Sequence, residues 1–374
     1  MSIYDEVLSF INDPRSELFD RLALAVFRHQ FENVLAYRQF CLACGKSPET
    51  VTALGQIPAA SAVAFKYADV RSHPAATPAM LTFRTSGTTK GFTERGRHLV
   101  PCPEIYRASA IAHLRRMLFP DGRRMPMLAL HPTADRMPES SLSAMLSWCI
   151  EEFSAGPTLC AATRMSVDTA AAIAFVDAAE ARAEPVCILG TTAASSALFT
   201  AIKQRGRPIR LASGSRLMDT GGAKGQVIPL TPAEVVARAR ETLAIDPALA
   251  INEYGMTEMC SQLYDATPFN SKRHDGAGYR VKLAPPWLRP TVLDPVSLNP
   301  LGEGRIGLLT FFDLANVGSI SALMTEDFGL VQGGAVAIIG RAAAGGARGC
   351  ALSIDEFARH ETSAQADRIR STIG

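Results

Sequence analysis

One stretch decides the fold that this sequence predicts: Met80-Leu81-Thr82-Phe83-Arg84-Thr85-Ser86-Gly87-Thr88-Thr89-Lys90-Gly91. Its first six residues are typical of a β-strand. The remainder is rich in hydroxyl groups and is interrupted by two glycines. Such a loop after a strand can turn several backbone N–H groups toward a phosphate, with the hydroxyls as further donors and Lys90 as a charge. The alternative is a solvated Ser/Thr turn, and the Walker A pattern is absent.

Strands and helices alternate along the chain after this loop. The expected strands are Met127–Leu130, Pro185–Leu189 and Pro208–Leu211, and the expected helices are Glu104–Leu118, Ser140–Phe153 and Pro232–Leu243. This alternation predicts an α/β fold with a mostly parallel sheet and functional loops at the strand ends. After about Ile251 the pattern is strand-rich, which indicates a smaller β unit. Before the loop, from Ile3 to about Ala43, the apolar spacing predicts several helices.

The composition limits the classes of protein to which the chain can belong. It has 374 residues, 47% of them hydrophobic and 20% charged, so its bulk is not disordered. The formal net charge of +2 gives no electrostatic footprint for nucleic acid or for an anionic membrane. No run approaches the ~18 apolar residues of a membrane span. Met1 to Glu6 is acidic and no apolar segment follows it, so we expect a cytoplasmic protein with reduced cysteines.

Far downstream lies a second motif, Asn252-Glu253-Tyr254-Gly255-Met256-Thr257-Glu258. Tyr254 offers a flat face to a purine or an aromatic acyl group, and Gly255 allows a tight turn or a close approach of the backbone. Thr257 offers a hydroxyl to a phosphate. Glu258 offers a hard oxygen to Mg²⁺, which usually binds through one or two carboxylates together with substrate phosphates.

The two motifs together resemble the ANL superfamily of adenylate-forming enzymes: acyl-CoA synthetases, peptide-synthetase adenylation domains and luciferases. The first loop is similar to the phosphate loop of that family, and Tyr254 to Glu258 is similar to its Y-G-x-T-E motif. The resemblance implies a ligase that uses ATP to convert a carboxylic acid to acyl-AMP, with release of pyrophosphate. It implies ATP and Mg²⁺ as cofactors, with Glu258 as the residue that holds the metal.

The resemblance also implies a role for each matching residue. Glu258, Thr257 and Thr88 are the expected catalytic residues, with Thr257 at the α-phosphate. Thr325-Glu326-Asp327 is similar to the T-x-D motif and Gly340-Arg341 to the G-R motif, and both motifs reach the ribose in the superfamily. The expected ATP-binding residues are Thr85, Ser86, Gly87, Thr89, Lys90, Gly221, Gly222, Tyr254, Gly255, Asp327 and Arg341.

Within the superfamily the chain looks most like the acyl-protein synthetase (LuxE-like) group. This likeness rests on the chain length and on Ile57-Pro58, Phe65-Lys66, Ser140-Ser141-Leu142, Thr220 to Gly225 and Arg348-Gly349-Cys350. The group includes proteins of phenazine-antibiotic biosynthesis that adenylate an aromatic carboxylate. The resemblance therefore implies an aromatic, phenazine-type acid as the substrate.

The fold implied by the resemblance is α/β: an ANL-type N-terminal adenylation domain with layered α/β sheets and a small β subdomain. Only 33 residues follow Arg341, so the mobile C-terminal domain is expected to be largely missing. We expect residues 1–80 to form the helical N-terminal part of the core and 81–250 its α/β nucleotide-binding part. Residues 251–340 are expected to form a β-rich subdomain of the same core, and 341–374 a short C-terminal remnant.

Four residues have two interpretations each. His131 lines an acyl pocket in the superfamily, or it caps the end of a strand. Cys350 is either the acceptor of the acyl group or a small buried thiol, and Arg348 beside it favours a reactive thiolate. Glu253 is either a supporting carboxylate or a solvated loop charge. Asp219 stands just before the expected adenine-binding glycines Gly221 and Gly222, and it either supports that site or only caps a turn.

The expected partners are a carboxylic acid and an acceptor of the acyl group, either a thiol or an acyl reductase. Nucleic acid and membranes are not expected, and the oligomeric state is left open, with a homodimer as one option. Two alternatives to an aromatic acid ligase remain. One is a fatty acid acyl-protein synthetase that acylates its own Cys350, and the other is a non-catalytic scaffold that binds a nucleotide.

Overall fold

The computed structural model describes residues 1–68, 70–72, 80–85, 95–221, 230–271 and 280–341. Their contacts divide the chain into two compact units, which are described separately. Unit 1 comprises Met1–Ala110, Met256–Gln262 and Asp275–Gly374, and unit 2 comprises Ile111–Gly255 and Leu263–His274. The boundary falls inside helix α4 (Pro103–Met117).

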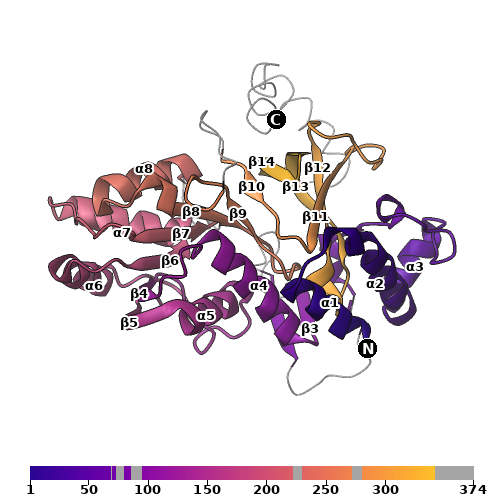
Figure 1. Cartoon of the computed structure of the whole chain (residues 1–374), viewed down its shortest axis with the longest axis horizontal. Coiled ribbons are helices and arrows are strands. Elements are labelled where there is room, and N and C mark those ends of the chain that lie inside the picture. The colour runs from indigo at the N-terminus through magenta and orange to yellow at the C-terminus, as the bar shows by residue number, and fades with distance from the viewer. Residues whose placement is uncertain (69, 73–79, 86–94, 222–229, 272–279, 342–374) are drawn as a thin grey trace. The chain divides into compact units, whose positions relative to one another are not determined.

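Unit 2 is built on a mostly parallel sheet (Figure 1). In spatial order its strands are β9 (Leu263–Asp265), β8 (Ala250–Tyr254), β7 (Arg216–Thr220), β6 (Cys187–Thr191), β4 (Met125–Ala129) and β5 (Ser154–Cys160). β9 runs antiparallel to β8, and the other neighbouring pairs are parallel. The helices of the unit are α5 (Ser141–Phe153), α6 (Thr169–Arg182), α7 (Thr192–Gln204) and α8 (Pro232–Leu243), with a 3₁₀ turn, η5 (Pro247–Leu249). Because β4 to β8 are parallel, their carboxyl ends lie along one edge, where α/β proteins bind ligands.

The local sequence explains where these four helices begin. Ser140, Asp168, Thr191 and Thr231 stand before α5, α6, α7 and α8, and each side chain accepts a hydrogen bond from a backbone N–H of the first turn. α8 adds a proline at its start and a capping box in which Glu234 bonds back to the cap. The expected helix Pro232–Leu243 is therefore confirmed at both ends.

One face of this sheet carries a large apolar cluster. Leu128, Ile188 and Leu217 are aligned on β4, β6 and β7 and are fully buried. They share the cluster with buried residues of α6, α7 and α8. A fully buried side chain of this size contributes roughly 1.5–3 kcal/mol relative to leaving it in water. Burial against these three helices is thus what holds the parallel strands in one layer.

One predicted strand of unit 2 is wrong. Pro208–Leu211 is not part of the sheet, and the strand next in the chain is β7, which starts at Arg216. The backbone N–H groups of Ile209 and Leu211 donate to the carbonyls of Thr242 and Leu243 at 2.8 and 3.2 Å. These carbonyls end α8 and have no partner within the helix. The N–H groups of this segment therefore bond the free carbonyls at the end of α8 and do not bond a neighbouring strand.

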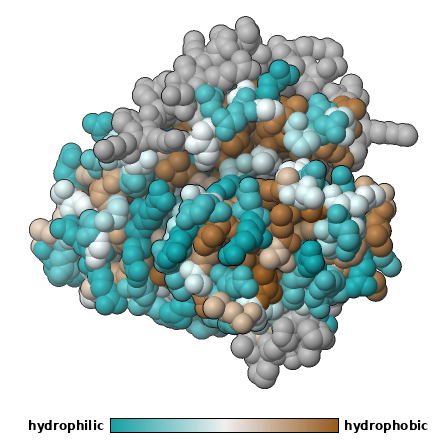
Figure 2. Space-filling view, turned by 45° about the vertical axis from the view of Figure 1, so that its right-hand side comes forward, coloured by the Kyte–Doolittle hydropathy of each residue, from teal (hydrophilic) through white to brown (hydrophobic). Residues whose placement is uncertain are grey.

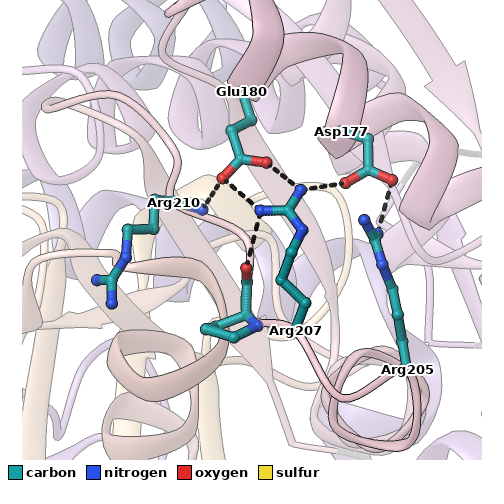
Figure 3. Close-up of polar contacts among 6 residues, drawn as sticks. Asp177, Glu180, Arg205, Arg207 and Arg210 are labelled. Atoms are coloured by element: carbon teal, nitrogen blue, oxygen red, sulfur yellow. Dashed lines mark hydrogen bonds and ion pairs between the residues drawn. The ribbon is translucent and has the colours of Figure 1, made fainter.

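A cluster of charges ties this segment to α6 (Figure 3). Arg205 Nη1 lies 2.6 Å from Asp177 Oδ2, and Arg207 Nη2 lies 2.6 Å from Glu180 Oε2 and 3.5 Å from Asp177 Oδ1. The backbone N–H of Arg210 donates to Glu180 at 2.6 Å. Exposed ion pairs contribute only about 0.2–1 kcal/mol each to stability. We therefore expect the cluster mainly to hold the segment after α7 in a fixed position against α6.

Unit 1 is built on a mostly antiparallel sheet. In spatial order its strands are β11 (Leu288–Leu293), β12 (Gly307–Asp313), β13 (Ala322–Gln332), β14 (Ala335–Arg341) and β10 (Lys282–Leu283), and β1 (Ala60–Ser61) pairs in parallel with β13. Its helices are α1 (Ile3–Asn12), α2 (Phe19–Asn33) and α3 (Leu35–Ala43), with 3₁₀ turns η1 (Ser16–Leu18), η2 (Leu54–Gln56), η3 (Ala62–Lys66) and η6 (Leu314–Asn316). The helices expected before residue 43 and the strand-rich pattern after 251 are confirmed.

Two hairpins of unit 1 carry motif residues. β2 (Leu81–Arg84) and β3 (Arg97–Val100) are antiparallel and enclose the Ser/Thr/Gly loop between them. β13 and β14 are joined at Gly333 and Gly334, whose φ angles of 55° and 78° suit a two-residue hairpin turn. Along this second hairpin the register shifts by one residue between Phe328 and Gly329, which marks a bulge.

The surface mixes hydrophilic residues with smaller hydrophobic areas (Figure 2). In the described part of the chain, the exposed large hydrophobic side chains are Met1, Leu35, Phe40, Leu42, Tyr67, Met165, Val296 and Leu298. None of the helices that the structure describes has the length and apolar character to cross a membrane.

Candidate active site

The loop after β8 places Thr257 and Glu258 in unit 1. Its backbone turns at Met256, whose carbonyl accepts the N–H of Met259 at 3.1 Å. His98 Nδ1 lies 2.7 Å from the carbonyl oxygen of Thr257, and Asn316 Nδ2 donates to the carbonyl of Glu258 at 2.7 Å. Both carbonyls are therefore occupied by side chains that are distant in the sequence.

The carboxylate of Glu258 is partly buried and electrostatically unusual. Burial raises its pKa to about 7, while its own backbone N–H, Arg341 and Lys66 oppose the shift and Glu326 adds to it. Among the described residues, no side chain donates a hydrogen bond to it. A desolvated carboxylate near two cations, with no side-chain donor among the described residues, is suited to receive a cation or a polar ligand.

The ribose candidates Asp327 and Arg341 are brought together by the β13–β14 hairpin. They are directly opposite each other in its register, and Arg341 Nη2 forms an ion pair with Glu326 Oε2 at 2.7 Å. The Thr325 hydroxyl donates to the carbonyl of Leu309 at 2.8 Å and accepts the N–H of Asp327 at 3.0 Å. The threonine of the T-x-D motif thus fixes the backbone at the aspartate.

The phosphate-loop candidates are described only at the base of their loop. Thr85 is buried, and its backbone N–H and its Oγ1 both pair with Gly96 at 2.9 Å, so the loop is closed between them. A Cβ on Gly96 would stand 3.2 Å from the carbonyl oxygen of Phe65, so a larger residue there would require a small shift of the neighbouring backbone. Ser86, Gly87, Thr88, Thr89 and Lys90 lie outside the described residues.

In unit 2, Gly221 and Tyr254 follow or end two adjacent parallel strands. The last residues of β7 and β8 are in register, so these two adenine candidates stand at the same edge of the sheet. Gly221 is exposed, and a Cβ there would meet no other atom within 4 Å. Gly255 is exposed and follows Tyr254 directly. Gly222 lies outside the described residues.

Behind these residues lies a buried polar network that the sequence did not predict. The Thr192 hydroxyl donates to Asp219 Oδ2 at 2.7 Å, and Asn252 Nδ2 donates to the same oxygen at 3.2 Å. The Thr220 hydroxyl donates to Glu253 Oε2. Asp219 and Glu253 are both buried within strands. The interpretations of Glu253 as a solvated loop charge and of Asp219 as a turn cap are therefore wrong, because each carboxylate binds a neighbouring strand or helix.

His131 stands just after β4 on the same edge of unit 2. Burial lowers the pKa of its imidazole to about 4, so the ring is neutral at physiological pH. Its buried Nε2 has no hydrogen-bond partner among the described residues. This geometry agrees with both interpretations of His131, the acyl-pocket residue and the cap of a strand end. Cys350 lies outside the described residues.

The donor set can be tested for its fit to Mg²⁺. No group of three or more His, Cys, Asp or Glu side chains that could hold a metal occurs in the described part of the chain. Glu258 alone fits a metal that takes one protein carboxylate and completes its shell with substrate phosphates and water. It does not fit a metal held by the protein by itself.

A scan against family models matches residues 3–358 to the family described as "Acyl-protein synthetase, LuxE". The chain belongs to this LuxE family. The class expected from the motifs, an acyl-adenylate-forming ligase, is confirmed by this membership.

The LuxE membership agrees with the curated relatives. One is the long-chain-fatty-acid–luciferin-component ligase of Vibrio harveyi, 24% identical over 358 residues that cover 91% of this chain and 88% of the relative. Another carries the same name in Aliivibrio fischeri and is 33% identical over 85 residues, 20% of this chain and 22% of the relative.

Solved structures show that this LuxE chain has the ANL adenylation fold. A 2-hydroxyisobutyryl-CoA ligase in the postadenylation state, in complex with 2-HIB-AMP, has a TM-score of 0.62 at 15% identity, covering 86% of this chain and 67% of that chain. An open conformation of the same ligase gives a TM-score of 0.61 at 17% identity, covering 87% and 70%. The expected α/β, ANL-type architecture is confirmed.

Proposed function

We propose that this LuxE-family protein activates a carboxylic acid with Mg·ATP. A carboxylate oxygen of the acid attacks the α-phosphorus, the bond between that phosphorus and the bridging oxygen to the β-phosphate breaks, and pyrophosphate leaves. The product is acyl-AMP. Such a displacement depends on positioning and charge stabilisation. The observation that carries the proposal is Glu258: its carboxylate is desolvated, lies within the fields of Lys66 and Arg341, and has no side-chain donor in the described part of the chain.

Each candidate residue receives a role in this reaction. Glu258 would hold Mg²⁺, whose charge offsets that of the phosphates, and Thr257 would donate its hydroxyl to the α-phosphate. Asp327 and Arg341, opposite each other on β13 and β14, would bind the ribose. Tyr254 would frame the adenine together with Gly221 and Gly222. The remaining phosphate contacts are assigned to Thr85, Ser86, Gly87, Thr88, Thr89, Lys90 and the backbone at Gly255.

The identity of the acid is the finer part of the proposal. An aromatic, phenazine-type carboxylate follows from the motif resemblance. A long-chain fatty acid is the second candidate, and it is supported by the name of the Vibrio harveyi relative. Either acid would lie near His131, whose neutral ring and unpartnered Nε2 suit a hydrogen bond to an uncharged acyl group.

The activated acyl group would then pass to a thiol or to a partner acyl reductase. The proposed thiol is that of Cys350, which would attack the acyl carbonyl and release AMP. Intact-mass analysis after reaction with ATP and an accepted acid separates these routes. An acyl adduct that is lost in a Cys350→Ser variant supports the thiol, and no adduct on the wild-type chain supports a separate partner.

The test of activation is ATP–pyrophosphate exchange with fatty, benzoic and phenazine carboxylates. We expect acid-dependent exchange with at least one class. The Glu258→Gln variant should lose about a hundredfold in rate, the usual cost of removing one preorganised electrostatic group. A matched control is Glu184→Gln, since Glu184 forms an exposed ion pair with Arg182 in unit 2. ATP binding without exchange for any acid would instead favour the non-catalytic scaffold.

A further inference from the structure

Among the described residues, the contacts that hold Glu258 act on its backbone, and no side chain donates to its carboxylate. A residue has two soft backbone torsions, and the peptide planes on either side of it are rigid. The carbonyl of Thr257 belongs to the plane before Glu258, and its own carbonyl belongs to the plane after it. Fixing both planes fixes the direction in which the Glu258 side chain leaves the backbone.

Both planes are fixed by buried side chains. His98 Nδ1 lies 2.7 Å from the Thr257 carbonyl, and Asn316 Nδ2 lies 2.7 Å from the Glu258 carbonyl. A carbonyl oxygen can only accept, so the proton of the His98 ring is on Nδ1. His98 and Asn316 are each 1% exposed, so water does not compete for either bond.

A third side chain holds the residues that follow. Asp313 accepts the N–H of Cys260 at 3.0 Å and the hydroxyl of Ser261 at 2.6 Å. It also caps η6 by accepting the N–H of Ala315 at 3.0 Å. Since Asn316 is the last residue of η6, one short element supplies two of the three holding groups.

The two holding elements are themselves anchored. The ring of Phe65 packs edge-on against His98, with centroids 5.3 Å apart and an interplanar angle of 90°. Gln30 Nε2, from α2, donates to the backbone carbonyl of Asn316 at 3.0 Å. Burial lowers the pKa of His98 to about 4, so the ring stays neutral and the single proton stays on Nδ1.

We infer that His98 and Asn316 are positioning residues that hold the backbone on both sides of Glu258 and thereby set where its carboxylate lies. The inference rests on the proposed function for the role of Glu258 in the reaction. The holding of the loop does not depend on that role and can be measured by itself.

Three variants of His98 separate the hydrogen bond from the bulk of the ring. The amide nitrogen of Asn lies where Nδ1 lies in His, so His98→Asn keeps a donor for the Thr257 carbonyl. Gln places its amide nitrogen at the position of Nε2, so His98→Gln keeps the polarity but moves the donor away. His98→Leu removes the donor and keeps most of the volume. His98 borders a small cavity of about 10 Å³.

The first readout is hydrogen exchange of the backbone amides in the segment Tyr254 to Gln262, measured by mass spectrometry without ATP or metal. A lost hydrogen bond of about 1.4 kcal/mol corresponds to a factor of ten. We expect about tenfold faster exchange in this segment for His98→Leu and His98→Gln, and wild-type exchange for His98→Asn. The matched control is His113→Leu, which replaces another buried histidine, in unit 2.

The second readout is pyrophosphate exchange across a range of Mg²⁺ concentrations. For His98→Leu and His98→Gln we expect about tenfold lower kcat, a higher Mg²⁺ requirement and an ATP KM changed by less than about threefold, whereas His98→Asn should retain most of the activity. A general loss of packing would damage all three variants alike.

The inference is supported if His98→Leu and His98→Gln show faster hydrogen exchange in the loop and a lower kcat, and if His98→Asn restores both. Unchanged loop exchange in His98→Leu and His98→Gln, or equal damage in His98→Asn, overturns it, as does faster loop exchange with unchanged turnover. If His98→Leu does not fold, the comparison of Asn with Gln decides. Absence of activity in the wild-type chain contradicts the proposed function, and the hydrogen exchange result still decides whether His98 holds the loop.

Discussion

Two glutamates of the same motif are held in opposite ways. Glu253, in unit 2, is buried at the end of β8, and its carboxylate accepts the hydroxyl of Thr220 on the neighbouring strand. Glu258, in unit 1, is held through its main-chain carbonyl by Asn316, while its carboxylate has no described side-chain donor. The difference separates two kinds of acid: Glu253 binds a neighbouring strand through its side chain, whereas Glu258, the proposed metal ligand, is held through its backbone.

The same contrast extends to the surrounding groups. In unit 2 the carboxylate of Asp219 is bonded by Thr192 and Asn252, which joins α7, β7 and β8. In unit 1, His98 and Asn316 bond the backbone carbonyls of the loop and not its charged side chain. Lys66 and Arg341 act on the Glu258 carboxylate through their electric fields. In unit 2 the buried acids are therefore bonded within the sheet, whereas in unit 1 Glu258 is influenced by charges that do not bond to it.

The largest expected effect compares the two glutamates directly. Glu258→Gln should lower the rate of acyl-AMP formation by about a hundredfold. Glu253→Gln should change it by less than about threefold, because an amide oxygen can still accept the Thr220 hydroxyl. Both variants are measured by pyrophosphate exchange under identical conditions. Equal losses in the two variants would remove the distinction between them.

The next effect concerns the ribose residues of unit 1. Hydrogen bonds to a charged group contribute about 1.5–3 kcal/mol, so Asp327→Ala should weaken ATP binding at least about tenfold. Calorimetric titration with ATP and Mg²⁺ measures this affinity. Glu32→Ala, an exposed change on α2, is the control and should bind as the wild type does. An unchanged affinity in Asp327→Ala would take Asp327 out of the nucleotide site.

A smaller effect, on stability, tests the buried polar network of unit 2. Thr220→Val keeps the shape but leaves the buried carboxylate of Glu253 without the hydroxyl, which should cost about 1–3 kcal/mol. The free energy of unfolding is measured in urea. Thr200→Val, at an exposed position on α7, is the matched control. Equal stability of the two variants would show that this network does not support the sheet edge.

The smallest effect is a pH dependence set by His131. Burial lowers its pKa in the folded state to about 4, below its ordinary value of 6.5. The unfolded chain therefore binds the proton first, and stability is lost as the pH falls from 6.5 to about 4. His131→Gln should reduce this loss and leave the melting temperature near pH 7.5 almost unchanged.

The pH measurement needs an internal reference, because Asp313 acts in the opposite sense. Burial raises its pKa from 3.8 to about 6, so its contribution to stability falls as the pH rises through that range. The informative quantity is the difference in melting temperature between wild type and His131→Gln at pH 5 and at pH 7.5. The same difference at both pH values would contradict the prediction.

Much of the fold follows from local signals in the sequence. The expected helix Pro232–Leu243 matches α8, and the Thr231 cap with the proline after it explains where this helix begins, because the cap accepts one of the first free N–H groups and proline has no N–H. The strand at Arg216–Thr220 was missed because it begins with a charged residue. Arg216 is nevertheless fully buried, paired with Asp121 at 2.9 Å, and lies over the rings of Phe119 and Phe269. That environment is made by distant segments.

The candidate site divides in the same way. Glu258, Asp327 and Arg341 could be named from their own motifs, and their roles stay predictions. His98 and Asn316 could not, because His98 is separated from Thr257 by 159 positions and acts on a main-chain carbonyl that carries no sequence signal. The one local hint was the Asp313 N-cap, which predicts a short turn but not what the turn holds.

The bulge in the β13–β14 hairpin makes the number of residues in this segment matter more than their identity. Asp327 and Arg341 face each other only because one extra residue is accommodated between them and the turn at Gly333-Gly334. Deleting a single residue there would move Arg341 by one position and send its side chain to the opposite face of the sheet. A single-codon insertion or deletion between these two residues and the turn would therefore separate them at once, even if every remaining side chain were kept.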